Sequence, residues 1–272
     1  ISPAIQNIAP EPPELDVAGK KLFWGDLHVH TAYSKCAAAN DGTPEEHLRF
    51  QRDRLGCRIL CLTEHGHILN HGEIEYSFDA LEREAGDGAV AIYASEPLST
   101  GQDTIFYSMD RQVIRQFHAL AQVVRSRGEH YRMIKQHLPP RSLIVARHFH
   151  SGDARRRNDP SSELIGFDPQ LEPFMEAHQI RGDNLRMMDE YGPRTVRHFL
   201  HAGCKLGLVG GTDHALGKGP DHFGLTGFWL DELTPEAVWQ ALWERRTYSV
   251  CNARITLWAT MNDCVLGDEA EA

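Results

Sequence analysis

The stretch LFWGDLHVHT, residues 22–31, joins a hydrophobic run to two histidines that are separated by one residue. We predict a β-strand over Leu22 to His28 on this pattern. Alternate residues of an extended chain point to the same side, so His28 and His30 can both face one ion. No G-x-G-x-x-G sequence follows this strand, which argues against a dinucleotide-binding, doubly wound sheet.

Strand-like and helix-like segments alternate along the rest of the chain, which is typical of parallel α/β architecture. About seven unequal repeats favour a distorted (β/α)7 TIM-like barrel with a C-terminal β extension. Further strands are predicted at 58–63, 89–94, 142–146, 173–177, 205–209 and 225–230, with one or two more in 253–265. Helices are predicted at about 44–55, 111–125, 129–137, 193–202 and 234–245.

Cap and turn residues mark where several of these helices begin or end. Thr43 and Glu46 form a capping-box pattern at the start of the first helix. The pair Pro139-Pro140 ends the helix before the fourth strand. Gly203 follows the helix that ends at about residue 202. These local signals support the division into elements.

The chain divides into three expected parts. Residues 1–20 are rich in proline and are predicted as an extended arm, 21–250 as the barrel, and 251–272 as a strand extension. Within the barrel, the segments 66–88, 97–110 and 151–172 are predicted as loops that shape the substrate site.

Composition excludes several classes of protein. The chain has 272 residues, 41% of them hydrophobic, and a formal charge of −10, which argues against a non-specific nucleic-acid binder. It has no apolar run long enough to span a membrane. Six cysteines without a C-x-x-C pair indicate neither a zinc ribbon nor a disulfide framework. The chain begins at Ile1, so either a leader was removed or a longer protein was cut; a cytoplasmic form is favoured over a secreted one.

Sixteen histidines are present, and many of them lie where a predicted strand ends. The carboxyl ends of parallel barrel strands meet at one face, which holds the active site in characterised barrel enzymes. Imidazole and carboxylate groups are ligands of zinc, manganese and iron. The pattern therefore predicts a metal site. Six successive strands end in such residues: His28 and His30; Glu64 and His65; Glu96; His148 and His150; Glu176 and His178; Asp213 and His214.

These motifs resemble the PHP family, named for polymerase and histidinol phosphatase. Gly25 to Thr31 (GDLHVHT) looks like its first motif, and Leu62 to His65 (LTEH) is similar to its second. Glu96, the segment around His148, and Gly211 to His214 (GTDH) follow in the family's order, so the resemblance covers roughly residues 21–260. The stretch from Gly224 to Tyr248 is similar to a large uncharacterised branch of the family, some relatives of which are described as carbamate-ester hydrolases. The resemblance implies a distorted seven-stranded barrel, two or three divalent metals (zinc, manganese or iron) and hydrolysis of phosphate esters.

Two departures from the family pattern affect the same third metal. Cys36 stands where the family usually has an acidic residue or a histidine. Asp213 and His214 are adjacent, whereas the family usually has Asp-x-His. Neighbours on a strand point to opposite faces, so both can be ligands only if the chain has already turned. We therefore expect two metals and leave the third open.

The resemblance and the strand ends together suggest roles in which metal-activated water attacks the ester. Glu96 is the expected bridging carboxylate, with Asp213 and His150 as further catalytic candidates; His150 is either a ligand or a proton donor to the leaving group. The expected ligands are His28, His30 and Asp213 for one ion, His148 and His178 for another, and His65 and His214 for a third. Further candidates, as ligands or as support behind them, are Cys36, Glu64, His150 and Glu176. Candidate contacts for a substrate anion are Arg147, Arg181 and Lys218.

Two alternatives remain beside a phosphoesterase acting on a small-molecule ester. The same site can cleave a carbamate, a carboxylic ester or an amide, because the polarising role of the metal is similar. The chain can also be a metal-binding domain without turnover that packs on the rest of a longer protein.

Overall fold

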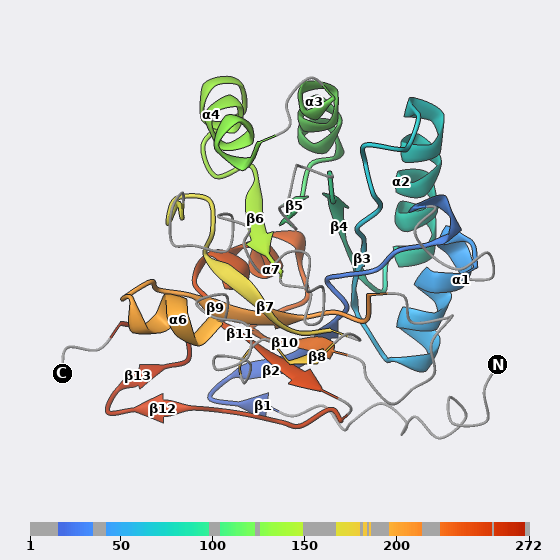
Figure 1. Ribbon diagram of the computed structural model, residues 1–272. Coiled ribbons are helices and arrows are strands. Elements are labelled where there is room, and N and C mark those ends of the chain that lie inside the picture. Colours follow the sequence, from blue (N-terminus) through green and yellow to red (C-terminus); the bar gives the residue numbers. More distant parts are fainter. Residues whose placement is uncertain are drawn as a thin grey trace.

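A computed structural model describes most of the chain (Figure 1). The described residues are 16–34, 42–97, 104–122, 126–148, 167–179, 182–183, 185, 196–213, 224–251 and 253–269. Every structural statement below concerns these residues. The expected Pro-rich arm falls mainly on residues 1–15, outside them, so the division of the chain into three parts stays a prediction.

One large sheet curls into a nearly closed barrel. Its strand order is β11-β10-β2-β3-β4-β5-β6-β7-β8, with β1 beside β2 and β9 beside β7. The strands are β1 (Asp16–Val17), β2 (Lys20–Gly25), β3 (Ile59–Leu62), β4 (Val90–Ser95), β5 (Thr104–Ser108), β6 (Ile144–Arg147), β7 (Phe174–Gln179), β8 (Gly182–Asp183), β9 (Gly207–Gly210), β10 (Gly224–Leu230) and β11 (Thr247–Cys251). The expected distorted α/β barrel is confirmed.

The distortion comes mainly from β5 and β10, which run against their neighbours within the barrel; the two-residue strands β1 and β8 are also antiparallel to theirs. The pairs β2–β3, β3–β4, β6–β7 and β7–β9 are parallel, as expected. However, β5 is antiparallel to both β4 and β6, and β10 is antiparallel to both β2 and β11. The expectation of a loop over 97–110 was therefore wrong, because it contains β5. This strand is buried along its whole length, so it shows no alternation of apolar and polar residues.

The barrel approaches closure where β9 lies against β10 and β11. The Thr226 hydroxyl accepts a hydrogen bond from the Gly210 N–H and donates one to the Gly210 carbonyl, both at 2.9 Å. Glycine is required here by space, because a Cβ on Gly210 would lie 2.5 Å from the Ser249 hydroxyl oxygen. A Cβ on the next residue, Gly211, would lie 2.3 Å from the Cβ of His28. This close approach brings the chain after β9 beside the first histidine motif.

Helices cover the outside of the barrel and one of its ends (Figure 1). The expected signals for the first helix are confirmed: Thr43 and Glu46 form a reciprocal capping box at α1. The segment 66–88, expected as a loop, contains the longest helix, which begins with a second capping box between Asn70 and Glu73. The helices are α1 (Pro44–Arg49, continued by a π-helical turn over Phe50–Arg54), α2 (His71–Ala85), α3 (Arg111–Ala121), α4 (Arg127–His137), α6 (Val196–His201) and α7 (Pro235–Trp243).

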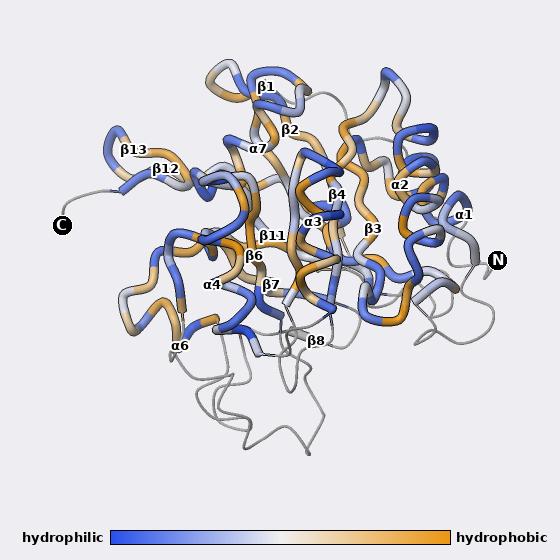
Figure 2. Tube along the Cα trace, turned by 90° about the horizontal axis from the view of Figure 1, so that it is seen from above, coloured by the Kyte–Doolittle hydropathy of each residue, from blue (hydrophilic) through white to orange (hydrophobic). Residues whose placement is uncertain are grey.

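Hydrophobic side chains fill the barrel interior. Leu27, Ile92, Phe174 and Phe228 belong to one buried cluster that also includes Leu242 of α7. Figure 2 shows helices such as α2 and α3 alternating between hydrophobic and hydrophilic residues along their length. This alternation fits helices with one face on the sheet and the other in solvent. None of the described helices has the length and hydrophobicity to cross a bilayer.

The C-terminal residues form a small separate sheet. β12 (Thr260–Met261) and β13 (Cys264–Val265) pair with each other as a hairpin. The segment before them is held to the barrel because the Trp229 indole N–H donates to the Leu257 carbonyl at 2.8 Å. The Tyr248 hydroxyl likewise donates to the Ile255 carbonyl at 2.9 Å.

Candidate metal centre

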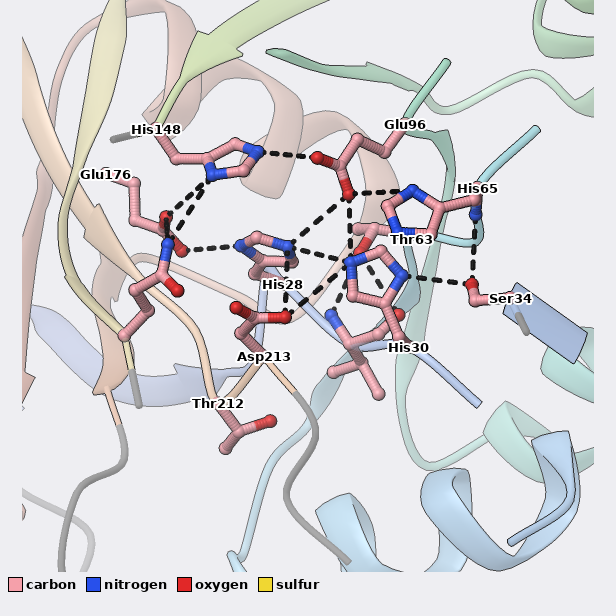
Figure 3. Close-up of polar contacts among 12 residues, drawn as sticks. His28, His30, Ser34, Thr63, His65, Glu96, His148, Glu176, Thr212 and Asp213 are labelled. Carbon is pink, nitrogen blue, oxygen red and sulfur yellow. Dashed lines mark hydrogen bonds and ion pairs between the residues drawn. The ribbon is translucent and has the colours of Figure 1, made fainter. Parts of the chain in front are cut away.

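Histidines and carboxylates gather where the strands of one direction end (Figure 3). The side chains are buried, except that of His65, which is partly exposed. The strands that carry these residues run in the same direction; β4 and β6 do so because each is antiparallel to β5, which lies between them. Their carboxyl ends therefore share one rim of the barrel. The residues are His28 and His30 after β2, Glu64 and His65 after β3, Glu96 after β4, His148 after β6, Glu176 in β7 and Asp213 after β9.

His28 and His30 face each other across the centre of this cluster. Their Nε2 atoms lie 3.0 Å apart. Each of these nitrogens also lies 3.7 Å from Oδ1 of Asp213. The two histidines therefore share one side of the extended chain, as their spacing predicts, and Asp213 completes a compact set of three.

Glu96 lies between two groups of histidines. Its Oε1 is 2.7 Å from Nε2 of His148. Its Oε2 is 2.9 Å from Nε2 of His30 and 3.4 Å from Nδ1 of His65. A carboxylate that turns each oxygen toward a different set of ligands has the geometry of a bridging group.

Asp213 is positioned by a turn of the backbone. Its φ of 42° lies in the left-handed region, which a non-glycine residue rarely adopts. Its N–H donates to the His28 carbonyl at 2.7 Å, which fixes the turn beside the first motif. The chain has thus already turned at Asp213. This turn is the condition set above for two adjacent residues to serve as ligands. His214 itself lies outside the described residues.

Three overlapping groups have the composition and spacing to hold an ion. In each group the candidate ligand atoms all lie within 4.8 Å of one another. The groups are His28, Glu96 and His148; His28, His30 and Asp213; and His30, His65 and Glu96. Imidazole nitrogen and carboxylate oxygen are a suitable donor set for zinc, manganese or iron.

The hydrogen bonds behind His28 support metal binding. Nδ1 of His28 lies 2.9 Å from Oε1 of Glu176. The other oxygen of Glu176 accepts a hydrogen bond from the Gln179 amide at 3.0 Å. An ionised carboxylate only accepts, so the hydrogen of a neutral His28 lies on Nδ1 and the lone pair lies on Nε2. That lone pair faces the cluster, as in metal sites where a carboxylate orients a ligand histidine.

The electrostatics of the cluster also favour a cation. Burial lowers the pKa of His28, but Glu176 and Asp213 outweigh it and raise the pKa well above its usual value. Burial would raise the pKa of Glu96, yet His148, His28 and His30 hold it well below the ordinary range. The pKa of His148 is raised, because Glu96 outweighs burial. In the absence of a metal, protons supply the positive charge that this arrangement attracts.

His65 differs from the other histidines. Burial, with the neighbouring His30 and His67, lowers its pKa to about 4, although Glu96 acts in the opposite direction. His65 is therefore neutral near pH 7. A neutral imidazole at this position is available as a ligand without losing a proton.

Sequence reasoning missed several residues that hold the ligands in place. Asp26 is buried, and its oxygens accept from the His28 N–H at 3.2 Å and from the Thr212 hydroxyl at 2.6 Å. Burial raises the pKa of Asp26 to about 7, despite these hydrogen bonds. Gln179 reaches both Glu176 and, at 3.4 Å, Nδ1 of His148. Asp26 lies within the GDLHVHT motif, so its place beside His28 could have indicated a supporting role. No feature of the sequence around Gln179 indicated such a role.

Two expected roles do not fit the observed positions. Arg147 was a candidate anion contact, but its guanidinium is buried and pairs with Glu172, away from the site. His178 was expected beside Glu176 because the two are separated by one residue. The strand has a bulge between them, and Nδ1 of His178 lies 2.9 Å from the Ser249 hydroxyl. His178 belongs to none of the three groups found among the described residues.

The remaining expected site residues cannot be placed. Their roles stay predictions, because they lie outside the described part of the chain. They are Cys36, His150, Arg181, His214 and Lys218.

Several solved structures resemble this one, and two of them are described here. The first is a two-domain protein from Bacteroides vulgatus that contains a predicted PHP-like metal-dependent phosphoesterase; the match covers 89% of this chain and 69% of that chain, with a TM-score of 0.59 and 16% identity. The second is PsfC from Pseudomonas syringae, with 84% and 91% covered, a TM-score of 0.53 and 13% identity.

No family model matches the sequence, and no curated protein does. At these identities the structural likeness speaks for the fold alone. The resemblance first seen in the GDLHVHT and LTEH motifs is thus confirmed as a resemblance of architecture: this chain has the distorted α/β barrel of the PHP type.

Proposed function

We propose that the protein is a metal-dependent hydrolase that cleaves phosphate esters. The observation that carries the proposal is the position of Glu96, which turns one oxygen to His148 and the other to His30 and His65. Such a carboxylate can hold two cations side by side, the arrangement that suits displacement at phosphorus. The predicted activity of the Bacteroides vulgatus neighbour points in the same direction.

Each group of ligands has a distinct place in this proposal. His28, His30 and Asp213 would hold one cation, and Glu96 with His148, which form a group with His28, would hold a second. His65, with His30 and Glu96, is available for a third. A divalent cation supplies a Lewis acid that polarises the ester and makes water acidic enough to attack near neutral pH.

Charge explains how an anionic substrate can bind although Arg147 is buried elsewhere. Two divalent cations bring four positive charges, against one negative charge each on Glu96 and Asp213. Counted with these two carboxylates alone, an excess of two positive charges remains for a phosphate group; the buried carboxyl groups of Glu64 and Glu176 reduce this excess where they are ionised. The outer carboxylate of Glu176 orients His28 and lies behind it, so it does not face the substrate side.

The test combines metal analysis with a substrate panel on one sample. We expect at least two equivalents of zinc, manganese or iron per chain, and hydrolysis of an aryl phosphate that stops with a chelator and returns when metal is added. Aryl phosphate turnover that survives complete metal removal would contradict the proposal.

The same panel separates the alternatives. An aryl carbamate, an aryl carboxylic ester and an anilide are assayed beside the phosphate on the metal-loaded protein. Faster cleavage of one of these would assign the site to another class of hydrolase. Stoichiometric metal without any turnover would favour a non-catalytic domain.

A further inference from the structure

Ser34 lies behind the candidate ligands and was not singled out by its sequence. It ends the short 3-10 turn Ala32–Ser34 and is buried. Its hydroxyl oxygen contacts three groups: a carboxylate oxygen of Glu64, Nδ1 of His30 at 3.0 Å and the backbone N–H of His65 at 3.0 Å. Figure 3 shows Ser34 on the side of His30 away from His28.

The directions of these hydrogen bonds follow from the chemistry of Glu64. Its carboxylate also accepts from the Thr31 hydroxyl at 2.5 Å and from the Thr31 N–H at 3.3 Å. The hydroxyl oxygen of Thr31 in turn accepts a hydrogen bond from the Tyr33 N–H at 3.1 Å. Burial raises the pKa of Glu64 and outweighs these donors, which lower it. The direction of the Ser34 hydrogen bond follows from geometry, because Oε2 of Glu64 also accepts from the Thr31 N–H and so acts as an acceptor toward Ser34.

The hydroxyl of Ser34 has one hydrogen and two lone pairs. The hydrogen points to Glu64. One lone pair accepts the His65 N–H, which is always a donor. The second lone pair is left for His30, so Nδ1 of His30 must be the donor and must carry a hydrogen. Nε2 of His30, which lies 2.9 Å from Glu96, is then the nitrogen that faces the cation position.

We propose that Ser34 is a positioning residue that keeps the hydrogen of His30 on Nδ1, using Glu64 to fix the direction of its own hydroxyl. The inference rests on the proposed metal site. It extends that site by assigning a role to two residues that belong to none of the three ligand groups.

The two histidines of the first motif are therefore held in different ways. His28 donates directly to the Glu176 carboxylate, whereas His30 reaches the Glu64 carboxylate through the Ser34 hydroxyl. The same hydroxyl holds the backbone of His65, so one oxygen fixes two members of the group His30, His65 and Glu96. Without the Ser34 hydroxyl, the hydrogen of His30 can move to Nε2 and be donated to Glu96. Nε2 is then no longer available as a ligand for a cation.

The first experiment measures zinc affinity by competition with a chromophoric chelator. We expect Ser34→Ala to weaken the tightest site about 10- to 100-fold, the usual effect of losing a partner behind a ligand histidine. Ser34→Thr, which keeps a hydroxyl, should restore most of the affinity. The matched control is Ser77→Ala, since Ser77 is also buried but lies in α2 and its hydroxyl has no hydrogen-bond partner. Equal affinity of Ser34→Ala and the wild type would overturn the inference.

The second experiment reads the hydrogen position and does not depend on a variant that folds. ¹⁵N-histidine NMR of the zinc-loaded wild type should show a hydrogen on Nδ1 of His30 and none on Nε2, with His30→Gln used to assign the signals. An Nδ1 of His30 without a hydrogen would overturn the inference even if zinc binds. If the wild type binds no zinc, the proposed function fails, and the inference is then judged on the zinc-free protein, where it still requires the Nδ1 hydrogen.

Discussion

Two buried clusters of ionisable groups are reached from neighbouring residues of the chain, Arg147 and His148, and they differ in how their charges are balanced. Arg147 and Glu172 form a buried ion pair whose charges cancel, with Nη2 of the arginine 2.9 Å from the carboxylate. The cluster of His28, His30, Glu96, His148 and Asp213 has two carboxylates and three imidazoles, and the pKa values of His28 and His148 are raised. A pair with opposite fixed charges is electrostatically complete, whereas two carboxylates among imidazoles attract further positive charge, which protons supply without a metal and a cation would supply when bound. The first cluster belongs to the fold, and the second to the proposed function.

The strongest way to break this contrast is to remove the shared carboxylate of the second cluster. We expect Glu96→Gln to lower kcat/KM for an aryl phosphate by about a thousandfold or more, because the amide cannot neutralise two cations. Bound metal should fall in parallel, with the fold retained by circular dichroism. Glu82→Gln, a change of the same kind at an exposed site on α2, should leave both values unchanged. Normal turnover in Glu96→Gln would show that the cluster is not the active site.

The corresponding change in the first cluster should affect folding. Glu172→Gln leaves the Arg147 charge buried and uncompensated, so we expect the free energy of unfolding to fall by about 3–5 kcal/mol. Urea denaturation measures it. Replacing both partners, Arg147→Met with Glu172→Leu, should recover most of the loss, because no buried charge remains. If Glu172→Gln alone unfolds at the wild-type urea concentration, the pair does not have the structural role described here.

The pH dependence of metal binding sharpens the contrast further. The raised pKa values of His28 and His148 mean that, without a metal, both imidazoles keep a proton to higher pH than a free histidine does. A cation must displace these protons, so its apparent affinity should increase as the pH rises, by about tenfold per pH unit for each proton displaced. Calorimetry in buffers of different ionisation enthalpy counts the protons released. An affinity that stays constant from pH 6 to pH 8 would contradict this account of the cluster.

The sequence predicted the class of fold and which side chains meet, but not the course of every strand in the sheet. Strand ends carry the ligands, and parallel strands share a rim, so the meeting of His28, His30, Glu96, His148 and Asp213 followed from simple rules. The antiparallel strand β5 was missed because it is short and Thr104 and Ser108 limit its hydrophobic run to three residues. The helix α2 was missed although the sequence carried its signals: Asn70 and Glu73 form a capping box, and Ile74, Phe78 and Leu81 recur at helical spacing.

The individual misassignments also have physical reasons. Arg147 directly precedes His148, and neighbours on a strand point to opposite faces, so its burial away from the site was predictable. The bulge between Glu176 and His178 was not, because it arises from the pairing of β7 with β9. The role of Ser34 depends on distances to Glu64 and His30 that only the folded chain provides.

The central claim is that the rim of this barrel holds cations, and anomalous scattering from crystals of the metal-loaded protein tests it most directly. We predict at least two peaks. One should lie about 2.0–2.2 Å from ligand atoms of His28, His30 and Asp213, and another at a similar distance from Glu96 and His148. Crystals of protein saturated with zinc or manganese that show no anomalous peak within the cluster would contradict the account.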